Sequence, residues 1–225
     1  MPFHLPSFPG LAADEAVNRL RPLLTQPRLE KIEKVLSQRC FGVSVVLENL
    51  YDRGNASAVM RTAEALGFGD LHSVEPTGKW KESQRTTAGA DKWTELKRWK
   101  STGEFVRFAK QEKIQLIVTA LQADAVPIAT IDFTKPSAFV LGNEKEGASE
   151  EIRAAADACV ILPMVGFTQS YNISVAAALG LYHIYQDRLR RQGFHHDLTE
   201  SQKMLLRAHY YLRTQDSGYD ILGLR

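Results

Sequence analysis

The sequence alternates between short apolar runs and segments with helical periodicity, and this alternation constrains the fold more than any other feature. Five apolar runs of strand length occupy residues 43–48, 70–76, 114–120, 137–142 and 158–164. Helical segments lie between most of these runs, for example at residues 55–67, 102–112 and 149–157. Alternation of this kind indicates a parallel sheet, and we therefore predict an α/β fold.

Further helical segments lie before and after the alternating region. Residues 11–39 carry two helical stretches, and Pro27 stands where the second would begin. Near the other end, Thr199 and Gln202 form a capping-box pattern that opens a helix over residues 199–215. We expect an N-terminal helical extension over residues 1–40, a core domain over 41–192 and a C-terminal helical extension over 193–225.

The composition is typical of a soluble globular protein. Of the 225 residues, 44% are hydrophobic and 24% are charged, and no apolar run reaches the roughly 18 residues that a membrane span needs. The N-terminal sequence MPFHLPSFPG lacks the features of a signal peptide, so we expect a cytoplasmic protein. Cys40 and Cys159 are the only cysteines, which fits a reducing compartment, and no pattern in the sequence suggests a metal site.

Polar loops follow the first, fourth and fifth apolar runs. They span residues 49–57, 142–149 and 165–174, and each joins an expected strand to an expected helix. Ligands of open parallel sheets bind beyond the carboxyl ends of the strands, so these loops are the candidate binding site. The dinucleotide pattern G-x-G-x-x-G, the phosphate loop and the G-x-S-x-G pattern of hydrolases are all absent from the sequence. Ordinary nucleotide cofactors, kinase chemistry and serine hydrolysis are therefore disfavoured.

Charge is unevenly distributed although the net charge is only +2. Residues 79–113 hold ten Lys or Arg against five acidic residues, whereas residues 114–186 hold three against seven. A basic region can bind a polyanion, but a solvated surface gives the same pattern. Composition alone leaves both interpretations open.

The three loops and their flanks carry a family resemblance. They read NLYDRGNASAVMRTAEALG, LGNEKEG and LPMVGFTQSYNISVAAA, beginning at Asn49, Leu141 and Leu162. In this order and spacing they resemble the motifs of the SpoU branch of the SPOUT superfamily, whose members are RNA ribose 2′-O-methyltransferases. The segment TAGADKW at residues 87–93 and the two helical extensions are similar to the TrmH group of tRNA guanosine 2′-O-methyltransferases. The resemblance therefore covers nearly the whole chain.

The resemblance implies a fold, a cofactor, a substrate and an assembly. We expect a parallel-sheet SPOUT fold with a deep trefoil knot in about residues 137–192, S-adenosylmethionine bound by the knotted loops, and an obligatory homodimer. The implied reaction is methylation of the ribose 2′-hydroxyl of a guanosine in tRNA, at position 18 in the D-loop. An rRNA 2′-O-methyltransferase is one alternative, and a non-catalytic RNA-binding protein of the same fold is another.

The resemblance also assigns roles to individual residues. Catalytic roles fall on Asn55, Arg61, Glu144, Ser170 and Asn172. Cofactor contacts fall on Thr119, Gly142, Leu162 and Tyr171, the last of which stands where the family pattern has a leucine.

The residues also have interpretations that need no family. Asn55 is a natural N-cap for the helix that Gly67 closes, and Arg61 could be a surface residue beside Glu64. Arginine is a poor base because its pKa exceeds about 12. For Arg61 we therefore favour electrostatic stabilisation of the forming alkoxide over proton removal with help from an RNA phosphate.

The loop residues can be interpreted in the same way. Glu144 lies in a loop flanked by glycines, whose backbone freedom would let the carboxylate approach a ligand. Ser170 and Asn172 stand where a strand hands over to a helix, with side chains and N–H groups facing an incoming ligand.

Candidate RNA contacts are basic residues of the extensions and of TAGADKW. We expect them at Arg19, Arg28, Lys92, Arg188 and Arg191, within a wider basic set that includes Lys31 and Lys34. Arg188 and Arg191 also have a structural explanation, because positive charge stabilises the end of a helix.

Overall fold

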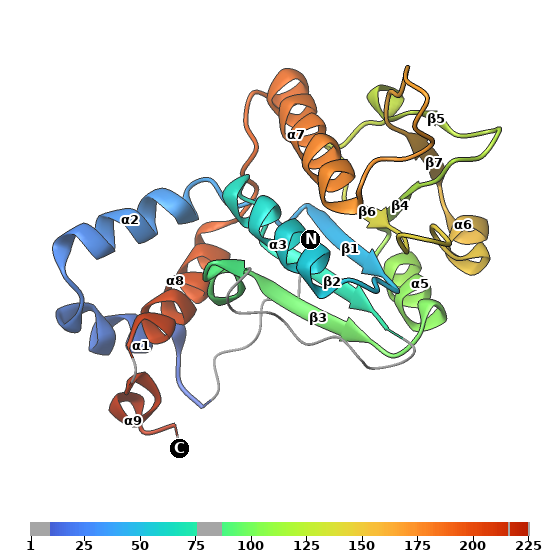
Figure 1. The fold of residues 1–225 in the computed structure, drawn as a ribbon. Helices are drawn as coiled ribbons and strands as arrows, with labels where there is room; N and C mark the ends of the chain where they lie inside the picture. Colours follow the sequence, from blue (N-terminus) through green and yellow to red (C-terminus); the bar gives the residue numbers. More distant parts are fainter. Residues whose placement is uncertain (1–9, 76–86, 216, 225) are drawn as a thin grey trace.

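A seven-stranded sheet forms the centre of the molecule. The computed structural model describes residues 10–75, 87–215 and 217–224. Every strand pairing is parallel, and the strand order is β3-β2-β1-β6-β4-β7-β5 (Figure 1). The strands are β1 (Val43–Glu48), β2 (Asp70–Val74), β3 (Glu95–Trp99), β4 (Gln115–Thr119), β5 (Val126–Pro127), β6 (Ser137–Leu141) and β7 (Ala158–Ile161). The predicted parallel α/β architecture is confirmed.

Helices cover both faces of the sheet (Figure 1). α3 (Arg53–Ala65) and α7 (Ile173–Gln192) pack on one face, and α5 (Thr102–Gln111) and α6 (Glu150–Ala155) pack on the other. Successive residues of β1 point into opposite layers, since Val45 belongs to the cluster with α3 and α7 and Val46 to the cluster with α5 and α6. The central strands are therefore mostly apolar, with a few buried polar residues such as Ser44 and Glu48, which is why apolar runs predicted them.

The sequence prediction missed β3 and β5, which lie at the two edges of the sheet. β3 reads ELKRW, with Lys97 and Arg98 exposed, and β5 is only two residues long. An edge strand has a neighbour on one side only, and charged side chains there discourage pairing with another chain. Such strands lack the continuous apolar run by which central strands are recognised.

The helices outside the sheet pack against one another as a single helical unit (Figure 1). α1 (Ala13–Leu20), α2 (Gln26–Leu36), α8 (Glu200–Thr214) and α9 (Gly218–Leu222) share one apolar cluster. Three short 3-10 helices are η1 (Arg21–Leu23), η2 (Ala90–Lys92) and η3 (Ile128–Thr130). Pro27 lies in the first turn of α2, and Thr199 and Gln202 form the predicted capping box of α8.

The described ranges contain neither a candidate membrane span nor a candidate metal cluster. None of their helices is long and apolar enough to cross a membrane. Within the same ranges, no three His, Cys, Asp or Glu side chains are grouped so that they could hold a metal ion.

Candidate active site

A cavity of about 570 Å³ lies at the carboxyl ends of β4, β6 and β7. The loops that follow these strands line it, with Leu121, Leu162 and Met164 as apolar walls and Ser170 and Asn172 as polar ones. Its volume lies within the range of about 300 to 1,000 Å³ that is typical of small-molecule sites. Two of the three predicted loops, 142–149 and 165–174, therefore line the cavity, whereas no residue of the first, 49–57, is part of the lining.

A chain of hydrogen bonds joins the three polar loops beside this cavity. The Asn172 Nδ2 donates to Asn55 Oδ1 at 3.3 Å, and the Asn55 Nδ2 donates to Glu144 Oε1 at 3.1 Å. Glu144 also accepts from the backbone nitrogens of Tyr51, at 3.0 Å, and Asp52, at 3.3 Å. The structure thus brings together three of the five residues that were expected to be catalytic.

These hydrogen bonds determine the charge state of Glu144. Burial raises the pKa of this carboxyl, but hydrogen bonds from the Tyr51 backbone and the Asn55 side chain outweigh that effect, and the pKa is lowered overall. Glu144 is therefore ionised at neutral pH. It can accept hydrogen bonds and hold the loops together, but it has no proton to donate.

The start of α3 differs from the sequence prediction. Asp52, and not Asn55, caps the helix, because its carboxylate accepts from the backbone nitrogens of Gly54, at 2.6 Å, and Asn55, at 3.1 Å. The expectation that Asn55 is the cap is wrong. With Asp52 in that role, the Asn55 side chain lies inside the first turn and can bind Glu144 and Asn172 instead.

Asn172 caps α7, a role that the sequence analysis did not assign to it. Its Oδ1 accepts from the backbone nitrogen of Ser174 at 2.9 Å. Next to it, the Tyr171 hydroxyl donates to the Pro163 carbonyl oxygen at 2.7 Å and so ties together the loop between β7 and α7. Ser170 is exposed on the same loop and lines the cavity. A leucine in place of Tyr171 could not make this loop contact.

Two residues expected to contact the cofactor are also fixed by contacts within the protein. A Cβ on Gly142 would come within 2.1 Å of the Ala148 nitrogen, so the glycine is required for the loop to fold back on itself. The sequence argument, which gave the glycine to ligand approach, missed this reason. Thr119 Oγ1 donates to the Val140 carbonyl at 3.0 Å and links β4 to β6. Both residues line the cavity together with Leu162.

The buried carboxylate of Glu48 supports the site from inside the protein. It accepts from Thr102 Oγ1 at 2.7 Å, and from the backbone nitrogen and Oγ of Ser149 at 2.8 and 2.6 Å. Ser149 ends the loop that carries Glu144 and caps α6. Sequence reasoning missed Glu48, although an acid at the end of the apolar run VSVVLE is a signal that could have found it.

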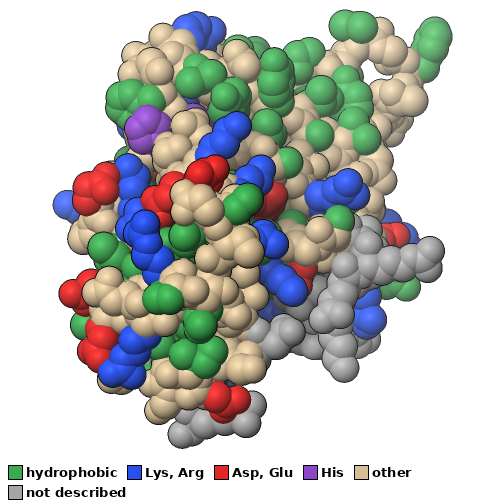
Figure 2. Space-filling view, turned by 90° about the vertical axis from the view of Figure 1, so that its left-hand side faces the viewer, with side chains coloured by type: hydrophobic (Ala, Val, Ile, Leu, Met, Phe, Trp, Pro, Cys, Tyr) green, Lys and Arg blue, Asp and Glu red, His purple; other side chains and the backbone are tan. Residues whose placement is uncertain are grey.

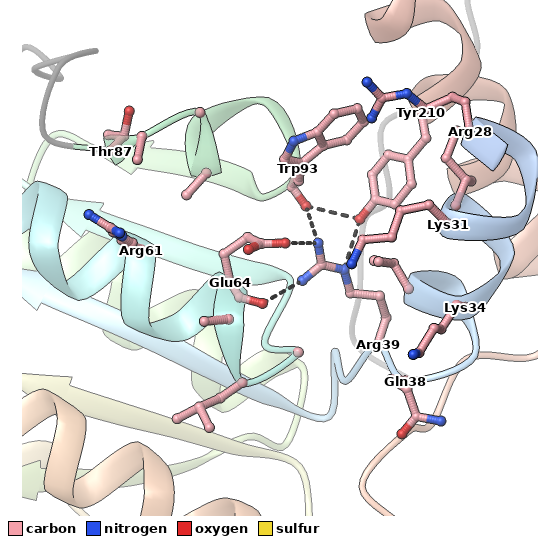
Figure 3. A pocket seen from close by; sticks show the side chains of 18 of the residues that line it. Arg28, Lys31, Lys34, Gln38, Arg39, Arg61, Glu64, Thr87, Trp93 and Tyr210 are labelled. Atoms are coloured by element: carbon pink, nitrogen blue, oxygen red, sulfur yellow. Dashed lines mark hydrogen bonds and ion pairs between the residues drawn. The ribbon is translucent and has the colours of Figure 1, made fainter. Parts of the chain in front are cut away.

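Arg61 lies outside this cavity, on the exposed side of α3. It lines a second hollow of about 740 Å³, which α2, α3 and η2 share (Figure 3). Glu64 follows three residues later but is paired with Arg39 at 2.8 Å. Within the described part of the chain, Arg61 therefore keeps an unpaired guanidinium that a ligand can reach.

Comparison with known proteins identifies the family. A model of the SpoU rRNA Methylase family matches residues 42–182, which include all three polar loops. The chain belongs to this family.

Several SpoU relatives are similar along most of their length. The tRNA (guanosine(18)-2′-O)-methyltransferase of Thermus thermophilus is 40% identical over 166 residues, which are 74% of this chain and 86% of that protein. The protein of the same name from Borreliella burgdorferi is 34% identical over 201 residues, 88% of this chain and 92% of the relative.

Two solved structures are similar in fold, and one of them contains the cofactor AdoMet. The Aquifex aeolicus TrmH/SpoU tRNA modifying enzyme matches with a TM-score of 0.76 and 29% identity, over 83% of this chain and 95% of that one. The SpoU methyltransferase AviRb from Streptomyces viridochromogenes, in complex with AdoMet, matches with a TM-score of 0.58 and 25% identity. This match covers 65% of this chain and 57% of that one.

Most basic residues expected to contact RNA lie at the surface of this SpoU protein. They are Arg19, Arg28, Lys92 and Arg191. Arg19 is paired with Glu15, and an exposed pair of this kind is weak and can exchange one partner for a phosphate. Arg191 is paired at 2.8 Å with Asp187, whose carboxylate is buried, so this pair holds the arginine more firmly. In the basic region 79–113, Lys79, Lys81 and Arg85 lie outside the described residues.

Arg188 is placed differently from the other candidates. Its side chain is 3% exposed and pairs with Asp197 at 2.8 Å, and it also donates to the carbonyl oxygens of Phe133 and His195. Asp197 in turn accepts from the backbone nitrogen of Gly42 at 2.7 Å. Arg188 therefore joins α7 to the start of β1, and its buried guanidinium cannot reach an RNA phosphate in this structure. We remove it from the RNA-contacting set.

Proposed function

We propose that this protein transfers a methyl group from S-adenosylmethionine to the ribose 2′-hydroxyl of a guanosine in tRNA, at position 18 of the D-loop. The observation that carries the proposal is the hydrogen-bonded chain of Asn172, Asn55 and Glu144 beside a cavity of ligand size. Relatives at 34% and 40% identity are named tRNA (guanosine(18)-2′-O)-methyltransferases, which supports the substrate.

The lining of the cavity fits the methyl donor. Leu121, Leu162 and Met164 offer apolar surface for the faces of an adenine ring, and Ser170 and Asn172 place polar groups in the same lining. When bound, S-adenosylmethionine supplies a methyl group on a positively charged sulfur. Glu144, which is ionised, adds negative charge to the same cavity.

Arg61 is proposed to act on the acceptor oxygen. Its exposed guanidinium has no ion pair among the described residues, and it stays protonated in water and in proteins. A fixed positive charge beside the ribose hydroxyl stabilises the alkoxide as the proton leaves, whereas a group that holds its own proton this tightly is a poor base. We therefore assign Arg61 charge stabilisation.

Asn55, Glu144, Asn172 and Ser170 are proposed to hold the reacting groups in place. The first three lock the loops after β1, β6 and β7 to one another, so the cavity and the N-terminal turn of α3 keep a fixed relation. Such alignment lowers the barrier by removing the entropy of orientation from the reaction step. Ser170 is exposed beside Asn172 and can meet the ligand directly.

The RNA surface is proposed to include Arg19, Arg28, Lys92 and Arg191. Figure 2, which views the molecule from the side of the helical unit, shows Lys and Arg side chains across the middle of that face. If about four or five basic residues contact phosphates, log affinity for tRNA should fall with log salt concentration at a slope of roughly −3 to −4.5. A flat salt response would contradict the RNA assignment.

The assembly proposed is a homodimer that uses the outer face of α7. Val175, Leu179 and Tyr182 are exposed on one stripe of this helix, and Val165 and Phe167 are fully exposed on the loop before it. Hydrophobic side chains gather in the same upper part of the molecule in Figure 2. Apolar patches of this kind mark interaction surfaces in soluble proteins.

The trefoil knot and the cytoplasmic location complete the proposal. The knot is proposed in about residues 137–192, where β6 and β7 flank β4 in the sheet although both follow it in the sequence. A knotted arrangement would explain how loops 142–149 and 163–172 come to line one cavity.

The decisive experiment is transfer of labelled methyl groups to unmodified tRNA, followed by mapping of the modified nucleotide. We expect one methylated guanosine, at position 18. A matched tRNA with 2′-deoxyguanosine at that position should accept nothing, because it lacks the acceptor oxygen. Labelling of the deoxy tRNA, or of rRNA in preference to tRNA, would contradict the proposal.

A further inference from the structure

The hollow beside Arg61 is lined by basic side chains from two facing helices. α2 contributes Arg28, Lys31 and Lys34, α3 contributes Arg61, and all four are exposed (Figure 3). We call this space, of about 740 Å³, the basic hollow. Four cations in one concave surface create a positive potential that attracts a polyanion.

Among the described residues that line the hollow, Glu64 is the only acidic one, and its charge is neutralised from within the protein. Arg39, whose exposed fraction is 1%, donates from Nη2 to Glu64 Oε1 at 2.8 Å and from Nη1 to the Glu64 carbonyl at 3.2 Å. Its other donors reach the Trp93 carbonyl at 3.1 Å and the Tyr210 hydroxyl at 3.0 Å. Figure 3 shows this guanidinium surrounded by its partners.

This arrangement leaves Arg61 unpaired. Opposite charges three residues apart on a helix normally attract each other, and Arg61 and Glu64 have that spacing. Arg39 holds the Glu64 carboxylate from the buried side, so Arg61 keeps its charge available at the edge of the basic hollow. The lining therefore carries four available positive charges and no available negative one.

The arrangement of the cations indicates what kind of anion fits. The charges are spread along α2 and across to α3 rather than converging on one point, which suits several phosphates in a row better than one small anion. Trp93 and Tyr185 add partly exposed aromatic surface, on which nucleic acid bases stack. A polynucleotide strand has both a row of phosphates and bases that can stack on these rings.

We propose that the basic hollow holds the backbone phosphates of the RNA strand next to the target nucleotide, and that Arg39 keeps the hollow positive by sequestering Glu64. The inference rests on the proposed function, because it takes Arg61 to stand at the reacting sugar. A strand that passes Arg61 continues into contact with Lys31 and Lys34 on the facing helix. Arg39 acts as a positioning residue, because it touches Glu64 and not the RNA.

The first test removes two charges of the basic hollow, in the variant K31Q/K34Q. We expect the slope of log tRNA affinity against log salt to become shallower by about 1.4 to 1.8, since each lost phosphate contact contributes about 0.7 to 0.9. The matched control is K110Q/K113Q, which removes two exposed charges at the far end of α5, on the other face of the sheet. The control should keep the wild-type slope. An unchanged slope in K31Q/K34Q, or an equal change in the control, would overturn the proposal.

The second test concerns Arg39. In R39Q the Glu64 carboxylate is released toward Arg61, so tRNA affinity and methyl transfer should both fall. In R39Q/E64Q the released charge is gone, so tRNA affinity and methyl transfer should both recover toward wild type. Thermal melting of each variant shows whether the fold is kept. Failure of the double variant to recover, at a melting temperature equal to that of R39Q, would overturn sequestration. If R39Q does not fold, E64Q alone decides, since it should bind tRNA at least as tightly as wild type.

These tests separate the basic hollow from the proposed reaction. If wild type methylates tRNA but K31Q/K34Q has the wild-type salt slope and activity, the hollow proposal fails and the function stands. If K31Q/K34Q changes the salt slope of tRNA binding as predicted but wild type transfers no methyl group, the proposed function fails and the proposed binding site stands.

Discussion

The cofactor cavity and the basic hollow use polar side chains in opposite ways. Around the cofactor cavity, Asn55, Glu144 and Asn172 are bound to one another, so the walls have a fixed shape before any ligand arrives. In the basic hollow, the only acid is held from inside and the exposed cations are left without partners within the described residues. Satisfied polar groups give a site rigidity, whereas unsatisfied charge at the surface gives it attraction for a ligand. The comparison predicts that variants on the two sides will alter different measurements.

The largest effect is expected from removing Arg61. R61A should lower the rate of methyl transfer by about 100- to 1,000-fold, the usual effect of losing one group that stabilises developing negative charge. Affinity for S-adenosylmethionine should not change, because Arg61 does not line the cofactor cavity. Single-turnover kinetics and calorimetry measure the two quantities.

R61K sharpens this result, because it keeps the charge but loses the planar fork. If charge is what matters, the rate of methyl transfer by R61K should lie between the rates of wild type and R61A. An R61K variant as inactive as R61A would contradict charge stabilisation, and weaker donor binding in either variant would show that the two hollows are not separate.

A smaller effect is expected at Glu144. E144Q replaces a carboxylate that accepts from Asn55 and two backbone nitrogens, and charge-assisted hydrogen bonds contribute about 1.5 to 3 kcal/mol each. We expect donor affinity to fall about 10- to 100-fold, measured by calorimetry. E150Q is the matched control, because it removes one negative charge from an exposed side chain at the start of α6, outside the lining of the cavity, and it should bind like wild type. Equal losses in the two variants would show that net charge, and not the hydrogen-bonded chain, holds the cavity.

On the side of the basic hollow, the expected effect is on stability at acid pH. Tyr185 lines this hollow, and His195 packs against it with ring centroids 4.9 Å apart. Burial, with help from nearby Arg188, lowers the pKa of His195 from 6.5 to about 3. Below pH 6.5 His195 is therefore protonated in the unfolded chain but neutral in the folded one. The free energy of unfolding falls as pH drops, by at most about 1.4 kcal/mol per pH unit.

Urea unfolding of wild type and H195F at several pH values between about 4 and 7 tests this sign. The variant lacks the titrating ring, so its stability should depend less steeply on pH in that window. Parallel curves for the two proteins would mean that His195 is protonated in the folded state.

The smallest effect is expected from Y171F, which removes one neutral hydrogen bond to the Pro163 carbonyl. A bond of this kind contributes about 0.5 to 1.5 kcal/mol, so donor affinity should fall roughly two- to tenfold while methyl transfer at saturating donor is kept. Y219F, on the distant helix α9, is the control. If Y171F lost affinity for tRNA and not for the donor, the loop between β7 and α7 would belong to the RNA-binding surface.

The sequence predicted the parts of the fold that depend on continuous burial. The central strands were found from their apolar runs, and the carboxyl-edge location of the cavity followed from the alternation of strands and helices. β3 and β5 were missed because a sheet edge imposes no such pattern, and the order of strands depends on contacts between residues far apart in sequence.

Within the candidate site, the errors came from residues with two equally good local roles. Asp52 and Asn55 are both favoured caps, and only the reach of the Asp52 carboxylate to two backbone nitrogens decides between them. Arg188 was expected to contact RNA, with a favourable charge at a helix end as the alternative. Its spacing from Leu181 and Ile184 places it on the buried stripe of α7, a signal in the sequence that could have corrected the prediction.

The helical unit has a consequence for the synthesis of the protein. α1 and α2 leave the ribosome before the strands of the sheet, and α8 and α9 leave after them, yet these helices share one apolar cluster. Contacts between segments so far apart cannot form until α8 and α9 have been translated. Val17, Leu20 and Ile32 must therefore wait, without their final neighbours, while every strand of the sheet is made. A messenger truncated before α8 would yield a polypeptide in which these apolar side chains of α1 and α2 stay exposed. Chaperones and proteases engage surfaces of this kind.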